Sequence, residues 1–261
     1  MTIACATGDG LGYSTCRYGQ SKLVFRGSGT EPEQDYIAFL GSTETFGKSV
    51  STPYPDLVSA AIGQPTLNLG CVNAGIDTFS SDATVRNMCQ NARATVVQIV
   101  GADKLSNPFY TVHGRRNDRF IAAHQPLRAL FPDVDFTGIN FARHLIETLA
   151  ADAPERLLEV REVLRIIWIS KMRALVDGID GPVVFLWMSR RPLDMRGNDP
   201  TAEDPLFVTR DMIAELRRPG VSVVEVVEGA EDHAPPLNTH LGEHAHSKAA
   251  AALSEILMQI K

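Results

Sequence analysis

The sequence lacks the features that mark membrane proteins, nucleic-acid-binding proteins and nucleotide-dependent enzymes. No apolar run approaches the ~20 residues that a membrane-spanning helix needs. Its 25 basic residues are outnumbered by 31 acidic ones, and the net charge of −6 gives no general attraction for a polyanion. Neither a GxGxxG motif nor a P-loop follows the first apolar run, which disfavours NAD and ATP. We therefore expect no cofactor, no membrane and no nucleic acid as partner.

Cysteine is also scarce, and its spacing carries no metal or redox signature. The 4 cysteines form no CxxC pair, so we expect free thiols in a reducing compartment. The N-terminus has no basic start followed by an apolar run, and we therefore expect no secretory signal and a cytoplasmic location. Histidines 233, 240, 244 and 246 suit zinc by residue type. Their spacing aligns poorly on a helix, however, and solvated histidines are the favoured interpretation.

Hydrophobic periodicity gives the clearest prediction of the fold. The chain of 261 residues has 44% hydrophobic residues, which is an ordinary globular composition. Apolar runs typical of strands buried on both faces alternate with helical patterns, an order that predicts parallel pairing. The predicted strands are residues 36–40, 66–69, 95–100, 183–188 and 221–227, and the predicted helices are residues 56–62, 82–93, 155–179, 211–217 and 243–260. The expected fold is a three-layer α/β/α sandwich with a five-stranded, mainly parallel, flavodoxin-like sheet.

The same patterns predict how the chain is divided. Residues 1–35 form a glycine-rich N-terminal arm, and residues 36–261 form a single α/β domain. Residues 102–152 are too long for a routine connection, and we expect an irregular insert that covers the strand ends. The apolar stripe along residues 155–179 is predicted to be core or subunit interface, so a homo-oligomer stays open.

Small, polar and histidine residues follow the predicted strands, where doubly wound sheets place their sites. The first cluster, FLGSTETFG, resembles the first block of the SGNH (GDSL-type) hydrolases, Gly-Asp-Ser-x-Thr-x-Gly. Gly41, Thr45 and Gly47 match that pattern. Ser42 stands where the family has Asp, and Thr43 stands where it has the nucleophilic serine.

Three further clusters extend the resemblance. NLGCVNAG is similar to the second block and places Gly75 at its oxyanion glycine, and VVQIVGADKLSN is similar to the third, with Asp103 where an Asn would fall. HLGEHAHSKAAAAL resembles the last block and places His240 at its catalytic histidine. The family's acid three residues earlier is replaced by Leu237. A shifted register would pair Glu243 with His246 instead.

The resemblance implies nucleophilic acyl transfer, in which a histidine activates a hydroxyl and preorganised donors bind the oxyanion. Thr43 would be the nucleophile, and His240 or His246 the base. Gly75, Asn73 and Asn107 would be the oxyanion donors. The extra methyl group of threonine crowds the path of attack. The alternative interpretation is therefore a catalytically inactive binding or partner protein on the same scaffold.

Arginines in the insert and after the fourth predicted strand suggest what the site binds. Guanidinium groups recognise carboxylate and phosphate, so an arginine-lined pocket would suit a small anionic substrate. The alternative is that these arginines form surface salt bridges, and that the polar residues beside them only stabilise turns. The candidate substrate-binding residues are Ser42, Glu44, Asp103, His113, Arg115, Arg116 and Arg190.

Overall fold

A parallel sheet of five strands forms the centre of the computed structural model, which describes residues 12–33, 35–194, 204–229 and 240–260. Its strands are β3 (Ile37–Gly41), β4 (Thr66–Gly70), β5 (Ala94–Gln98), β8 (Val183–Ser189) and β9 (Val221–Val227). They lie in the order β4-β3-β5-β8-β9, and each neighbouring pair is parallel. The predicted flavodoxin-like order and the three-layer α/β class are confirmed.

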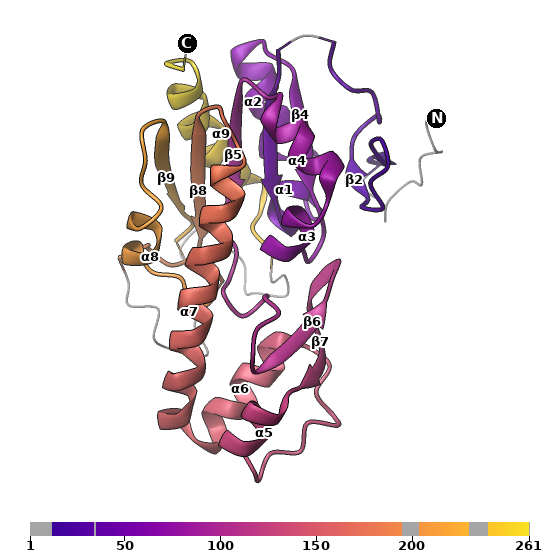
Figure 1. The fold of residues 1–261 in the computed structure, drawn as a ribbon. Helices are drawn as coiled ribbons and strands as arrows, with labels where there is room; N and C mark the ends of the chain where they lie inside the picture. Colours follow the sequence, from indigo (N-terminus) through magenta and orange to yellow (C-terminus); the bar gives the residue numbers. More distant parts are fainter. Residues whose placement is uncertain (1–11, 34, 195–203, 230–239, 261) are drawn as a thin grey trace.

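Two layers of helices bury the two faces of this sheet (Figure 1). On one face lie α3 (Ile76–Ser80), α4 (Ala83–Gln90) and α7 (Pro154–Asp177), which share a hydrophobic core with the inward side chains of the strands. The other face is covered by α2 (Tyr54–Ile62) and α9 (Glu243–Leu257). The short helix α8 (Arg210–Ala214) precedes β9. Because β3, β5 and β8 are buried on both faces, their apolar runs do not alternate.

The insert at residues 102–152 is not irregular, which corrects the expectation from its length. It contains the antiparallel hairpin of β6 (Tyr110–His113) and β7 (Arg116–Ala123), followed by α5 (Gln125–Leu130) and α6 (Ala142–Asp152). Figure 1 shows these elements gathered at one end of the molecule, from which α7 runs back along the sheet. The short hairpin strands and a bulged register weaken the periodic signal in this part of the sequence.

The described part of the N-terminal arm packs against the turn that follows β3. Strands β1 (Thr15–Cys16) and β2 (Phe25–Arg26) pair antiparallel. The Arg26 side chain is buried, and its guanidinium donates hydrogen bonds to the carbonyl oxygens of Gly47 and Val50 at 2.5 and 2.9 Å. The arm therefore supports the short helix α1 (Thr43–Phe46) that opens the candidate site.

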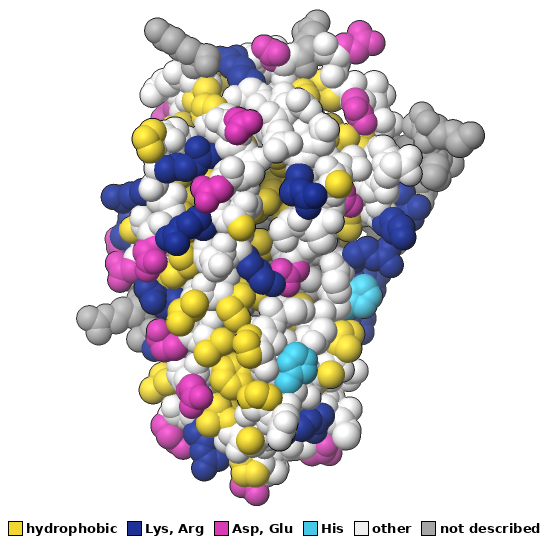
Figure 2. Space-filling view, viewed as in Figure 1, with side chains coloured by type: hydrophobic (Ala, Val, Ile, Leu, Met, Phe, Trp, Pro, Cys, Tyr) yellow, Lys and Arg dark blue, Asp and Glu magenta, His cyan; other side chains and the backbone are white. Residues whose placement is uncertain are grey.

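The surface carries charges of both signs. Figure 2 shows basic and acidic side chains interspersed over the face that α7 crosses, with apolar side chains gathered toward the end that holds α5 and α6. Over the part of the chain that the structure describes, no helix combines the length and apolarity needed to cross a bilayer. The described ranges also contain no cluster of three His, Cys, Asp or Glu side chains arranged for a metal ion.

Trp168 on α7 is the side chain whose removal we expect to cost the most. It is 0% exposed, and its indole N–H donates to the carbonyl oxygen of Val100 at 2.9 Å. We predict that Trp168→Ala lowers the free energy of unfolding by about 3–5 kcal/mol, through lost burial and a residual cavity. Chemical denaturation measures this change. Ile166→Ala on the same helix is the control, because Ile166 is 61% exposed and its loss should change the free energy by less than about 0.5 kcal/mol.

Candidate functional site

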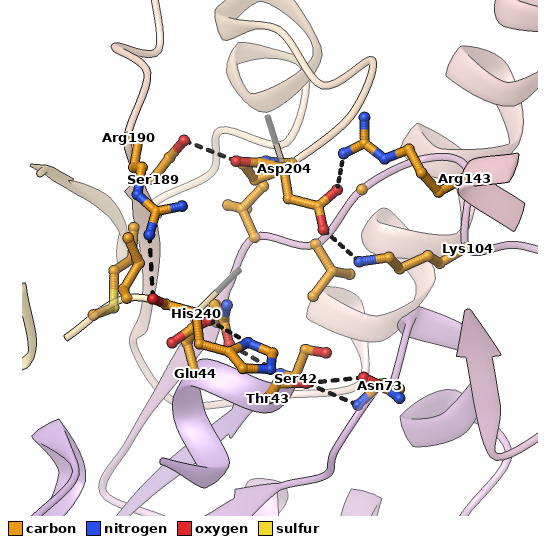
Figure 3. A pocket seen from close by; sticks show the side chains of 17 residues that line it. Ser42, Thr43, Glu44, Asn73, Lys104, Arg143, Ser189, Arg190, Asp204 and His240 are labelled. Carbon is orange, nitrogen blue, oxygen red and sulfur yellow. Dashed lines mark hydrogen bonds and ion pairs between the residues drawn. The ribbon is translucent and has the colours of Figure 1, made fainter. Parts of the chain in front are cut away.

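A cavity of about 490 Å³ opens at the carboxyl ends of the strands (Figure 3). Its walls combine residues from the turns after β3, β4, β5 and β8 with Asp204 and the segment that leads into α9. The polar side chains among its lining residues are Ser42, Thr43, Glu44, Asn73, Gln98, Lys104, Arg143, Ser189, Arg190, Asp204 and His240. The strand-end clusters singled out in the sequence therefore meet around one hollow.

Gln98, at the end of the central strand β5, fixes the turn that carries the first cluster. Its side-chain oxygen accepts hydrogen bonds from the backbone N–H of Ser42 at 2.9 Å and from the N–H and hydroxyl of Thr45 at 3.3 and 2.7 Å. Gly41 leaves the room for this contact, since a Cβ there would lie 2.0 Å from the Thr45 hydroxyl. The start of α1 is thus held against the sheet with little freedom.

Thr43 is the first residue of α1, and its hydroxyl faces Asn73 after β4. The hydroxyl accepts the backbone N–H of Asn73 at 3.0 Å and donates to its side-chain oxygen at 3.2 Å. Asn73 adopts a left-handed backbone with φ 61°, a conformation that non-glycine residues rarely hold and that recurs at functional sites. Among the described residues, no hydrogen bond joins Thr43 to an imidazole.

His240 and Glu44 form a partly buried pair on the same cavity. The Nδ1 atom of His240 lies 3.3 Å from Oε1 of Glu44, and their side chains are 26% and 16% exposed. Burial alone would raise the pKa of Glu44, but hydrogen bonds and charge attraction from His240 and His246 outweigh it and leave the pKa below its ordinary value. Glu44 is therefore held as a carboxylate beside the ring, a role that the sequence analysis did not give it.

His246, the other candidate base, does not line the cavity. It is 1% exposed, its Nδ1 atom accepts the backbone N–H of Tyr54 at 3.1 Å, and its Nε2 atom lies 3.8 Å from Oε2 of Glu44. Glu243, which a shifted register would pair with it, is exposed and accepts a hydrogen bond from Ser51 instead. Leu237, at the position of the family's acid, lies outside the described residues. Of the two candidate bases, His240 is therefore the one that lines the cavity.

The wall of the cavity opposite Glu44 and His240 carries cationic side chains, and we call it the cationic wall. Lys104 and Arg143 both contact the carboxylate of Asp204, at 2.6 and 3.3 Å. Figure 3 shows these two side chains pointing toward Asp204, across the cavity from Glu44 and His240. Arg190, which follows β8, donates to the backbone oxygen of His240 at 3.2 Å. Two cations, Lys104 and Arg143, thus share one carboxylate on this wall, whereas Arg190 lies beside the His240 backbone.

Asp103 is buried beside this wall, although the sequence suggested that it binds substrate. It is 0% exposed, and neither of its side-chain oxygens has a hydrogen-bond partner among the described residues. One of them packs so closely on Gly101 that a Cβ there would lie 2.3 Å away. Burial raises the pKa of Asp103 from its ordinary value of 3.8 to about 6, although Lys104 opposes the shift.

Two of the predicted oxyanion donors are committed elsewhere. The backbone N–H of Gly75 donates to the side-chain oxygen of Asn117 on β7 at 2.7 Å, inside the protein. The side chain of Asn107 closes its own turn by accepting the N–H groups of Phe109 and Tyr110 at 2.8 and 3.1 Å. Both residues stabilise loops, and Asn73 is the predicted donor that remains on the cavity.

Of the arginines predicted to line the pocket, the structure places only Arg190 at the cavity. Arg115 and Arg116 lie exposed at the turn of the β6–β7 hairpin, where their N–H groups donate to the ring of His113 at 3.2 Å. None of these three residues lines the cavity, whereas Arg190 does. The cations that accompany Arg190 are Lys104 and Arg143. Lys104 stood in the third cluster without being chosen, and Arg143 lay in the stretch expected to be irregular.

Comparison with known proteins gives a family and a set of solved structures. The lipase Lip_vut3 from a goat rumen metagenome has 12% identity and a TM-score of 0.45, over 87% of this chain and 97% of that one. A family two carbohydrate esterase from Clostridium thermocellum has 8% identity and a TM-score of 0.48, over 90% and 67%. A putative lipolytic protein of the G-D-S-L family from Desulfitobacterium hafniense DCB-2 has 11% identity and a TM-score of 0.42, over 85% and 99%.

With identities of 8–12% and TM-scores below 0.5, these similarities say nothing about the chemistry of this chain. The chain itself belongs to the family described as a domain of unknown function (DUF6473), whose model matches residues 1–261. No curated protein matches it. Conclusions about chemistry therefore depend on the residues of the cavity.

Asp103 gives the site a testable dependence of stability on pH. The folded protein holds this proton more tightly than the unfolded chain does. Asp103 therefore stabilises the fold at a pH below its ordinary pKa of 3.8, and this contribution is lost as the pH rises through about 6. Relative to Asp103→Asn, the wild-type free energy of unfolding should fall between about pH 4 and about pH 7. Urea titrations across this range measure the difference. The exposed Asp133→Asn should show no such trend, and parallel curves for wild type and Asp103→Asn would contradict the prediction.

Proposed function

We propose that the protein is an ester hydrolase or acyltransferase of SGNH-like type, with Thr43 as nucleophile and His240 as base, acting on a small anionic substrate. The observation that carries the proposal is that one cavity receives both the Thr43 hydroxyl and a histidine whose Nδ1 atom faces a partly buried carboxylate, 3.3 Å away. A carboxylate at Nδ1 leaves Nε2 free to accept a proton, which is the arrangement that general-base catalysis requires.

The reaction follows from these groups. The Thr43 hydroxyl turns its proton from Asn73 to Nε2 of His240, and its oxygen attacks the ester carbonyl. The side-chain N–H of Asn73 and the backbone N–H of Thr43 stabilise the oxyanion. The acyl–oxygen bond of the ester then breaks, and the alcohol leaves with the proton from His240. Water, or a second alcohol, releases the acyl group from Thr43 by the same steps in reverse.

The cationic wall favours a substrate that carries a carboxylate or phosphate. Lys104 and Arg143 face Glu44 and His240 across the cavity, with Asp204 between the two cations, and Arg190 lies beside the His240 backbone. Within a partly enclosed cavity such charges are less screened than on the open surface. An anionic group bound there would leave its ester bond pointing at Thr43 and His240.

Substitutions at Thr43 and Ser42 test which hydroxyl is the nucleophile. Thr43→Ala should reduce hydrolysis of p-nitrophenyl acetate at least about 100-fold, because no acyl-enzyme forms. It should also abolish labelling by a fluorophosphonate probe. Thr43→Ser should keep activity, since it retains the hydroxyl and removes the crowding methyl group. Unchanged thermal unfolding confirms that each variant is folded. Loss of activity in Ser42→Ala with retention in Thr43→Ala would assign the reaction to the neighbouring hydroxyl instead.

A ligand-binding protein without catalysis is the second candidate, and one observation favours it. Both hydrogen-bonding directions of the Thr43 hydroxyl are taken by Asn73. Under this alternative, wild-type protein neither turns over esters nor reacts with fluorophosphonate. Millimolar phosphate would nevertheless raise its melting temperature, through Lys104 and its neighbours on the cationic wall.

The cationic wall predicts selectivity between substrates. For a p-nitrophenyl ester with a terminal carboxylate, Lys104→Met should raise KM about tenfold, because a charge-assisted contact is lost and Asp204 is left to repel the substrate. For a neutral ester of equal length the change should be less than about twofold. Lys48→Met, at an exposed position away from the cavity, is the control. Equal changes in KM for the two esters in Lys104→Met would show that the wall does not select substrates by charge.

A further inference from the structure

The mechanism proposed above makes no use of His246, although this histidine is the more deeply buried of the pair on Glu44. It is 1% exposed, it lies on α9 against α2, and its ring packs 5.7 Å from that of Tyr54 between centroids. An imidazole in an apolar layer is costly unless its two nitrogens find partners. Both nitrogens do face polar atoms, and these atoms differ in kind.

The first partner fixes where the proton of His246 lies. The backbone N–H of Tyr54, in the first turn of α2, points at Nδ1 of His246 from 3.1 Å. A backbone N–H can only donate, so Nδ1 must accept and carry no proton. Neutral His246 therefore carries its proton on Nε2, the nitrogen that faces Oε2 of Glu44 at 3.8 Å.

The second partner, Glu44, connects His246 to His240 on the cavity. Glu44 is an acceptor at both oxygens when it is ionised, and its other oxygen lies 3.3 Å from Nδ1 of His240. The proton of neutral His240 is therefore favoured on Nδ1, and the lone pair remains on Nε2. These contacts form a chain. The Tyr54 N–H fixes which nitrogen of His246 carries the proton, His246 faces Glu44, and Glu44 favours the proton of His240 on Nδ1.

We propose that His246 is a positioning residue, which anchors the Glu44 carboxylate from inside the protein and thereby keeps His240 in the tautomer that can act as a base. The inference rests on the proposed function. It adds a second histidine, and the backbone N–H of Tyr54 behind it, to the carboxylate–histidine pair.

The other polar and charged groups near these contacts do not change the proton positions assigned to His246 and His240. Arg190, after β8, engages the backbone oxygen of His240 and not its ring. The phenol of Tyr54, on α2, is hydrogen-bonded to the Thr45 hydroxyl at 2.7 Å. Glu243, on α9, is held by Ser51. Within the described ranges, Glu44 is the carboxylate within contact distance of both rings.

Nitrogen-15 NMR of histidine-labelled wild-type protein tests the order directly and needs no substrate. At a pH where both rings are neutral, His246 should show an unprotonated Nδ1 and a protonated Nε2, and His240 should show the reverse. Glu44→Gln should abolish the preference at His240 while leaving that of His246, because the Tyr54 N–H is unchanged. A protonated Nδ1 on His246, or a protonated Nε2 on His240 in the wild type, would overturn the inference.

Kinetics on the full-length protein then tests the consequence. His246→Leu should lower kcat for p-nitrophenyl acetate about tenfold with KM changed less than about twofold, since a displaced base slows the chemical step more than binding. His246→Gln should restore most of the loss, because its amide N–H reaches the place of Nε2. In a Glu44→Gln background, His246→Leu should have little further effect. His244→Gln, exposed on the same helix, is the matched control.

The outcomes separate this inference from the proposed function. If wild type turns over esters and His240→Ala abolishes the activity, but His246→Leu retains it, then His246 is not a positioning residue and the proposed function stands. If wild type turns over no ester and takes up no fluorophosphonate while the tautomers are as described, the proposed function is wrong. His246 then has no catalytic base to position.

Discussion

Three hydrogen bonds to one carboxamide oxygen hold the candidate site in place. Gln98 ends the central strand of the sheet, and its side chain ties down both ends of the turn that begins at Ser42. Thr43 and Glu44 lie within that turn, so their positions are set by the sheet and not by a free loop. A short helix of four residues could not fix them by its own hydrogen bonds. Rigid support of this kind is what a preorganised site requires.

The turn after β4 contributes in a complementary way. Asn73 holds an unfavourable left-handed backbone, and this conformation brings its N–H and its side-chain oxygen to the same hydroxyl of Thr43. The surrounding contacts must outweigh a strain on the order of 1 kcal/mol. Asn117, reaching over from the β6–β7 hairpin, secures the same loop through Gly75 and Thr78. The two turns and the hairpin therefore stabilise one another around the cavity.

The sheet could be predicted from the sequence because its strands are buried on both faces and its helices are amphipathic, which are local and periodic signals. The location of Thr43 and His240 on one cavity also followed, since parallel strands place their carboxyl ends on one edge. The roles of Glu44, Arg143 and Asp204 could not be predicted. They depend on contacts between residues 61 to 196 positions apart, for which a single sequence holds no pattern. The prediction that Arg115 and Arg116 line the pocket rested on a dense local run of charge. In the structure these residues lie at a hairpin turn.

The two sides of the cavity come from different parts of the chain. Lys104 and Arg143 belong to the insert at residues 102–152, whereas Thr43 and Glu44 belong to the turn after β3. Exchange of the insert, with Asn117 kept to secure the loop after β4, would change the charged wall and leave the turn after β3 in place. The charge of the cavity and the geometry of its strand-end turns can therefore change separately along the chain.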